Sequence, residues 1–248
     1  MLVAKPEGNY RFFPSSGEAE LPFCNSVIAD PGYEIVRATL ERPIPYRAGF
    51  ELIEQHLKAL GRPRQALCGL ELRCSEPYTG EGFRAFNAQY AEVLSGWGLH
   101  GGTPGSGTTA RTNVAPALHA PKEQVLFAFS YTVRSTVDRP TFVVSGAAAG
   151  RGRPGDQSFD AVREKVANMV QALEARLKEM GVSWELSTET VAYAPQDIEP
   201  ALRMELLPRI GTAVLNGIRW FPSRAPVIGS ELELGTHGVR QELRVAVR

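Results

Sequence analysis

The pentapeptide ARTNV, residues 110–114, lies between a loop rich in glycine and threonine, residues 101–109, and an apolar pattern typical of a strand, residues 125–133. An arginine that such a loop presents at the mouth of a strand can hold a carboxylate through a two-pronged, charge-assisted hydrogen bond. The alternative is a solvated surface arginine. The order of elements around the pentapeptide recurs later in the chain, and this repetition is the main indication of the fold.

The counterpart of Arg111 is Arg224, which lies in the loop 211–226 before strand-like sequence over 227–247. Apolar periodicity predicts strands at 33–44, 66–74, 141–147 and 184–194, and helices at 50–60, 81–97, 159–180 and 198–210. Each half therefore has the order strand, helix, strand, helix, loop, strand. This repetition indicates a duplicated α+β domain.

The repetition predicts an irregular arm over 1–21, a first lobe over 22–137 and a second lobe over 138–248. Each lobe is expected to be a mixed β-sheet with two helices on one face. The other face of each sheet must then pack against the sister lobe or against a neighbouring chain.

Composition bounds the class of partner. Lys+Arg and Asp+Glu both number 27 in 248 residues, so no global field favours nucleic acid or an anionic membrane. The apolar runs are short and no charged-then-apolar leader precedes them, which argues against a membrane span and a secretory signal. We expect a cytoplasmic protein whose partners are small molecules or other copies of the chain.

The cysteines and histidines do not form a recognisable ligand pattern. Three cysteines are an odd number without zinc-type pairing, which favours reduced thiols over a disulfide framework. The four histidines are scattered along the chain. Neither a metal site nor a cofactor is therefore expected.

Several motifs resemble the RidA/YjgF family of reactive enamine/imine deaminases. In the second half they are FVVSG at 142–146, the long helix ending at Gly181, TVAY at 190–193, PSRAPV at 222–227 and ELE at 231–233. In the first half, which is more diverged, they are FCNSV at 23–27 and ARTNV. The resemblance covers residues 22–245 as two tandem copies.

The resemblance implies chorismate-mutase-like lobes, assembly into trimers and active sites in clefts between neighbouring lobes. It also implies an arginine that holds the substrate carboxylate and a glutamate on the last strand that positions the attacking water. The first lobe keeps the arginine, Arg111, but has Phe127 where the family's glutamate aligns. In the second lobe Glu233 matches that glutamate, yet it follows Arg224 by only nine residues, 233 − 224.

The inherited roles are thus divided between the lobes. One hypothesis is a composite site with Arg111 and Glu233 as its catalytic pair. The alternative is that Glu233 is a solvated strand residue and that only Arg111 matters. The candidates for substrate binding are Arg111, Thr112, Asn113, Arg224, Tyr33 and Tyr131.

Other side chains are weaker candidates. Trp220 and Phe221 belong either to an aromatic wall with the two tyrosines or to the core. Arg151 and Arg153 either add charge for a second carboxylate or lie on a mobile surface loop. Asn113 stands where many family members have a cysteine, so thiol chemistry is not expected there.

The function that the resemblance implies is hydrolysis of a small carboxylate-bearing enamine or imine, like 2-aminoacrylate or 2-aminomuconate, to the keto acid and ammonia. A homo-oligomer, with a trimer favoured, is expected. One alternative is a chorismatase-like enzyme acting on a cyclic dicarboxylate, because the sequence EGFRAFN at 81–87 is faintly similar to theirs. The other is a ligand-binding protein without catalysis, because fold does not fix function.

Overall fold

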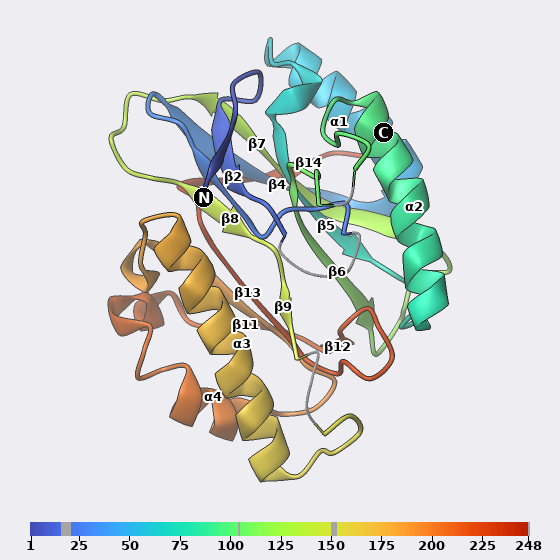
Figure 1. Ribbon diagram of the computed structural model, residues 1–248, viewed down its shortest axis with the longest axis vertical. Coiled ribbons are helices and arrows are strands. Elements are labelled where there is room, and N and C mark those ends of the chain that lie inside the picture. Colours follow the sequence, from blue (N-terminus) through green and yellow to red (C-terminus); the bar gives the residue numbers. More distant parts are fainter. Residues whose placement is uncertain (16–20, 104, 150–152, 248) are drawn as a thin grey trace.

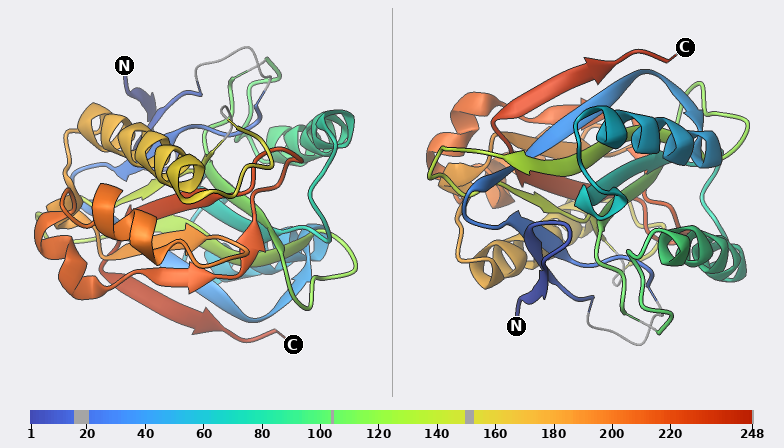
Figure 2. Two further views of the ribbon diagram at one scale, coloured as in Figure 1. Left: turned by 90° about the horizontal axis from the view of Figure 1, so that it is seen from below. Right: turned by 90° about the horizontal axis from the view of Figure 1, so that it is seen from above.

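The computed structural model describes residues 1–15, 21–103, 105–149 and 153–247. It consists of two mixed β-sheets packed face to face, with helices on the two outer faces (Figures 1 and 2). The α+β class with two mixed sheets is confirmed. The inner face of each sheet is covered by the other sheet of the same chain.

The first sheet has the strand order β12-β6-β5-β7-β4-β14. Its strands are β4 (Tyr33–Pro45), β5 (Leu67–Arg73), β6 (Ala110–Pro116), β7 (Val125–Arg134), β12 (Ser223–Arg224) and β14 (Gln241–Val245). Helices α1 (Tyr46–Ala59) and α2 (Gly80–Gly96) cover its outer face. Their buried side chains, among them Phe50, Ile53, Phe86 and Tyr90, form one core with the outward side chains of the sheet.

The second sheet has the order β1-β2-β3-β8-β13-β10-β11, and β9 also pairs with β13. Its strands are β1 (Val3–Lys5), β2 (Tyr10–Phe13), β3 (Ser26–Ala29), β8 (Phe142–Val144), β9 (Ala147–Ala148), β10 (Glu189–Tyr193), β11 (Arg219–Phe221) and β13 (Glu233–Gly238). Helices α3 (Phe159–Glu179) and α4 (Glu199–Glu205) lie on its outer face. Short 3-10 turns occupy Arg64–Ala66, Trp184–Leu186 and Gly211–Asn216.

Helix α3 follows from its apolar stripe. The Ser158 hydroxyl caps its first turn by accepting from the Ala161 N–H at 3.4 Å, and Gly181 ends it with a φ of +72°. Val166, Val170 and Leu173 are buried against the second sheet as expected, but Phe159 at the first position is 48% exposed. The stripe therefore belongs to the core from its second turn onward.

The sheets exchange strands across the expected boundary near residue 137. Strand β3 belongs to the second sheet. The hairpin β1–β2, which lies in the expected irregular arm 1–21, extends the same sheet. Conversely, β12 pairs with β6 and β14 pairs in parallel with β4 in the first sheet. Strands from both halves of the chain thus complete each sheet. The division into two sequential lobes remains a prediction.

Three local expectations differ from the structure. ARTNV, read as the end of a loop, lies within strand β6, where it pairs in parallel with β5. The strand expected from residue 184 begins at 189 after a 3-10 turn, and the helix expected over 198–210 is the shorter α4.

Among helices in the described ranges, none combines the length and the apolar character that a membrane crossing requires.

Candidate active site

Arg111 lies on β6 of the first sheet and is held from several directions. Its side chain is 4% exposed, and its Nη1 donates to Asn87 Oδ1 of α2 at 2.9 Å. Its backbone N–H donates to Ser145 Oγ at 2.8 Å, and its carbonyl accepts from the Gly146 N–H at 3.2 Å. Arg111 is therefore a buried, oriented cation rather than a solvated surface residue.

Aromatic rings surround the Arg111 guanidinium. Its central carbon lies 4.2 Å from the ring centroid of Phe23 and 4.9 Å from that of Tyr90, with Phe83 and Phe86 both at 5.5 Å. Burial lowers the pKa of Arg111 to about 10, so the group stays charged at neutral pH. Phe23 and Phe83 are only half-buried, whereas Phe86 and Tyr90 are buried.

Glu233 is the first residue of β13 and is buried at 3% exposure. Burial raises the pKa of its carboxyl group to about 8, although the charges of Arg73, Arg176 and Arg111 oppose that shift. Its Oε1 is buried and has no hydrogen-bond partner among the described residues. Glu233 is thus largely protonated at neutral pH and is not a solvated strand residue.

Gly146 connects the arginine and the glutamate. Its N–H donates to the Arg111 carbonyl, and its Cα lies so close to Glu233 that an added Cβ would be 1.8 Å from Oε1 and 2.4 Å from Cδ. A side chain at this position would therefore force the Glu233 side chain out of its present place. The glycine therefore sets the approach of β13 to the Arg111 strand.

Replacing Gly146 with alanine should displace the Glu233 side chain and lower turnover by at least tenfold, with a loss of about 1–3 kcal/mol in unfolding free energy from overpacking. Gly235→Ala on the same strand is the matched control, because its methyl group would meet Tyr193 Cε2 at an ordinary 3.9 Å. Denaturant unfolding and steady-state rates of both variants measure the two effects. Equal behaviour of the two variants would contradict the assigned contact.

Arg73, which the sequence did not single out, is a second buried guanidinium at the end of β5. Its central carbon lies 4.1 Å from the ring centroid of Phe127 and 5.4 Å from that of Phe221. Its Nη1 donates to the Leu72 carbonyl at 2.9 Å, whereas its Nη2 makes no hydrogen bond in the described ranges and lies 3.8 Å from Glu71 Oε2 in an ion pair. The guanidinium of Arg73 therefore stacks over Phe127, the residue that the resemblance to RidA proteins aligns with a glutamate.

Further polar groups lie close to the two arginines. The buried Asn113 accepts at Oδ1 from Gln124 Nε2 at 3.0 Å, and its Nδ2 has no partner within the described residues. Tyr78 donates to Gln124 Oε1 at 2.7 Å. Burial raises the pKa of Cys74 to about 12, so that side chain stays a thiol. Unpaired donors and cations therefore predominate here, which suits an anionic ligand.

The other sequence candidates lie in different surroundings. Thr112 lines a cavity of about 40 Å³ between the sheets, together with Arg111 and Tyr193. Arg224 is exposed on β12. Tyr131 packs in the first-sheet core beside His56.

Tyr33 lies between the guanidiniums of Arg62 and Arg134. Trp220 is 54% exposed. Arg153 pairs with Glu164 at 3.6 Å, and Arg151 lies outside the described residues.

The solved structure of a chorismatase resembles this fold with a TM-score of 0.52 at 14% sequence identity. The similarity covers 91% of this chain and 80% of that one. The expected likeness to chorismatases is confirmed for the fold.

Sequence relatives give a closer comparison. A 2-amino-5-chloromuconate deaminase of Comamonas testosteroni is 35% identical over 247 residues, covering 95% of both chains. The model of the family described as 2-aminomuconate deaminase CnbZ matches residues 2–243. Membership of the RidA/YjgF family stays a prediction. The chain belongs to the 2-aminomuconate deaminase CnbZ family.

Proposed function

We propose that this protein hydrolyses 2-aminomuconate, or a closely similar amino-dienedioate, to the 2-oxo dicarboxylic acid and ammonia. The observation that carries the proposal is that Arg111, Arg73 and Glu233 are all buried and that the charges of both arginines act on the Glu233 carboxyl group. The family description and the relative's activity support the same substrate class. The proposed site draws its residues from one chain, and assembly into a trimer stays a prediction.

The two arginines suit the two ends of a dicarboxylate. Arg111 offers its guanidinium between half-buried aromatic rings, and Arg73 offers an Nη2 that makes no hydrogen bond within the described residues and lies 3.8 Å from Glu71 Oε2. Both cations act on Glu233, since each lowers the pKa of that carboxyl group. A substrate held at both ends would therefore have its central carbons near Glu233.

The reaction needs one proton delivered to carbon and one water. In the proposal, protonated Glu233 gives its proton to a carbon of the enamine system. The C=C–NH₂ group thereby becomes an iminium group, HC–C=NH₂⁺, and Glu233 becomes a carboxylate. Water then adds to the C=N carbon while the Glu233 carboxylate accepts the proton of that water. The carbinolamine formed expels ammonia and leaves the keto group. No covalent bond to the protein is required.

The test of the reaction is ammonia release from freshly generated 2-aminomuconate, with 2-aminoacrylate as a monocarboxylate comparison. Release from 2-aminomuconate well above the spontaneous rate, with an equal amount of 2-oxo acid, is the expected result. A rate equal to the spontaneous one would overturn the deaminase proposal. In that case pyruvate release from chorismate tests the chorismatase alternative, and binding without turnover would indicate a ligand-binding protein.

The assignment of Arg73 to the second carboxylate predicts a selective defect. Arg73→Gln should raise KM for 2-aminomuconate by about tenfold to a hundredfold, the cost of one or two charge-assisted hydrogen bonds. Turnover of 2-aminoacrylate, if the wild type shows any, should change much less, because that substrate has one carboxylate. Steady-state kinetics on both substrates measure the difference. An equal loss on both would remove Arg73 from the role of second clamp.

A further inference from the structure

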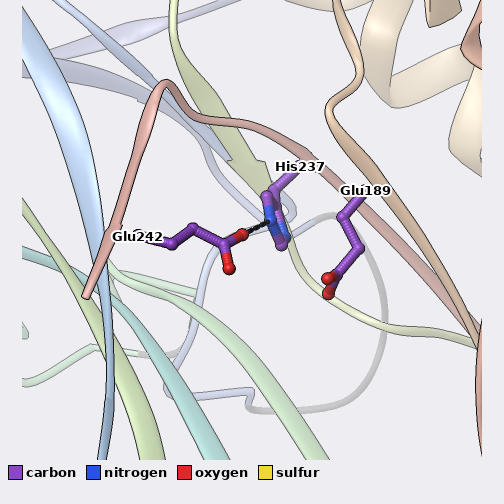
Figure 3. A group of neighbouring side chains, drawn as sticks. All are labelled: Glu189, His237 and Glu242. Atoms are coloured by element: carbon purple, nitrogen blue, oxygen red, sulfur yellow. Dashed lines mark hydrogen bonds and ion pairs between the residues drawn. The ribbon is translucent and has the colours of Figure 1, made fainter. Parts of the chain in front are cut away.

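Three side chains of metal-ligating type that the proposed reaction does not use meet between the sheets, and two of them line the same small cavity as Arg111. Glu189 on β10, His237 on β13 and Glu242 on β14 place one ligand atom each within 4.8 Å of the others. Figure 3 shows the imidazole of His237 between the two carboxylates. Two of these residues belong to the second sheet, whereas Glu242 belongs to the first.

Strand pairing explains how residues far apart in the sequence come together. Glu189 and His237 are directly opposed in the antiparallel β10–β13 ladder. A short turn then brings the chain from β13 to β14, which carries Glu242 in parallel register with Arg37 of β4. This long-range pairing is why the scattered histidines gave no sign of a ligand set in the sequence.

Each of the two carboxylates has one oxygen paired with an arginine, and the second oxygen of Glu242 is in hydrogen-bond contact with His237. Glu189 Oε2 is paired with Arg219 at 2.8 Å, but its Oε1 is buried and has no hydrogen-bond partner in the described part of the chain. The Glu189 side chain is 10% exposed, and burial raises the pKa of its carboxyl group. Glu242 Oε2 lies 3.5 Å from Arg37, whereas its Oε1 lies 2.9 Å from His237 Nε2.

We infer that Glu189, His237 and Glu242 form a binding site for a divalent transition-metal cation such as Zn²⁺. One imidazole nitrogen and two carboxylate oxygens are donors that zinc accepts, at bond lengths of roughly 2.0–2.2 Å. Ligand atoms around such an ion are about 3.3 Å apart. The 2.9 Å between His237 and Glu242 is near that spacing, and Glu189 needs a small inward shift.

Solvent reaches the site from an adjacent hollow. It has a volume of about 760 Å³ and is lined by Glu189 and Glu242, together with Arg219 and Arg240. Water from this hollow can complete the coordination. Because the ligands come from both sheets, the cation would fasten the C-terminal strand β14 to the second sheet, so its effect falls on stability.

Thermal unfolding and titration calorimetry of the chelator-treated protein with zinc chloride test the inference. We expect one Zn²⁺ per chain, and a rise in Tm of about 5–10 °C when free zinc is 100-fold above Kd. Glu242→Gln, at an exposed position, and Glu189→Gln should each weaken zinc binding at least tenfold. His237→Ala should abolish it.

Glu34→Gln is the matched control. Glu34 is a buried carboxylate of neighbouring β4, bonded to Arg240 at 3.1 Å and Gln241 at 3.0 Å, and is not one of the three ligands. It should keep wild-type zinc binding and the full Tm rise. Absence of stoichiometric zinc binding by the wild type would overturn the site, as would equal weakening by Glu34→Gln and Glu242→Gln. Neither readout depends on deaminase activity.

Discussion

Arg111→Ala is expected to lower kcat/KM for 2-aminomuconate by about 10²–10³-fold. The change removes the charge-assisted hydrogen bonds to one substrate carboxylate, worth about 1.5–3 kcal/mol each. It also leaves Asn87 Oδ1 without its 2.9 Å donor beneath α2. Steady-state kinetics, with circular dichroism to confirm folding, measure the effect.

Arg203→Ala is the control for loss of an arginine, because Arg203 is exposed on α4 and pairs with Glu199. It should leave kcat/KM within a factor of two. Arg111→Lys keeps the charge but loses the planar fork, so it should recover only part of the activity. Wild-type kcat/KM in a folded Arg111→Ala variant would contradict the carboxylate-binding role.

Glu233→Gln should abolish most turnover, by about 10²–10⁴-fold, because an amide cannot deliver or accept the proton that the reaction moves. The pH dependence of the wild type follows from the pKa of about 8 that burial gives this group. The acid form is present below pH 8 and is lost above it. We therefore expect kcat/KM to fall as pH rises, with an apparent pKa near 8.

The same substitution should change the pH dependence of stability. The ordinary pKa of Glu233 is 4.5 and its folded value is about 8, so the folded chain binds a proton that the unfolded chain does not in this range. The contribution of this proton to the unfolding free energy is fully present below pH 4.5 and is lost as pH rises through 8. The difference of about 3.5 in pKa corresponds to about 5 kcal/mol as an upper value.

Urea unfolding from pH 5 to pH 9 measures this contribution. Wild-type unfolding free energy should fall by several kcal/mol more than that of Glu233→Gln over this range. Glu54→Gln, at a side chain 42% exposed on α1, should follow the wild type. Parallel curves for the wild type and Glu233→Gln would show that Glu233 titrates normally in the folded protein.

Local sequence patterns predicted much of the fold. The stripes of α1, α2 and α3 and the branched runs of β4 and β7 lie where their periodicity places them, because burial against a sheet selects those spacings. The exchange of β3, β12 and β14 between the sheets could not be predicted, since strand pairing is a long-range choice. For the same reason the hairpin β1–β2 was read as an irregular arm.

The candidate site was predicted in part. The structure brings Arg111, Asn113 and Glu233 into one region, although their joint catalytic role is still a prediction. Arg73 was missed because the alternation of its strand assigns it to a polar face, and only sheet-on-sheet packing buries that face. The contact of Gly146 with Glu233 depends on β9 crossing beside β13, which no local pattern encodes.

The most direct test of the proposed site is a crystal structure with cis,cis-muconate, which has the two carboxylates and the diene of the substrate but no amino group. We expect one carboxylate on the guanidinium of Arg111, the other on Arg73, and the Glu233 carboxyl group facing the carbon chain. Muconate bound away from Arg111 and Glu233, in a protein that nevertheless releases ammonia from 2-aminomuconate, would contradict it.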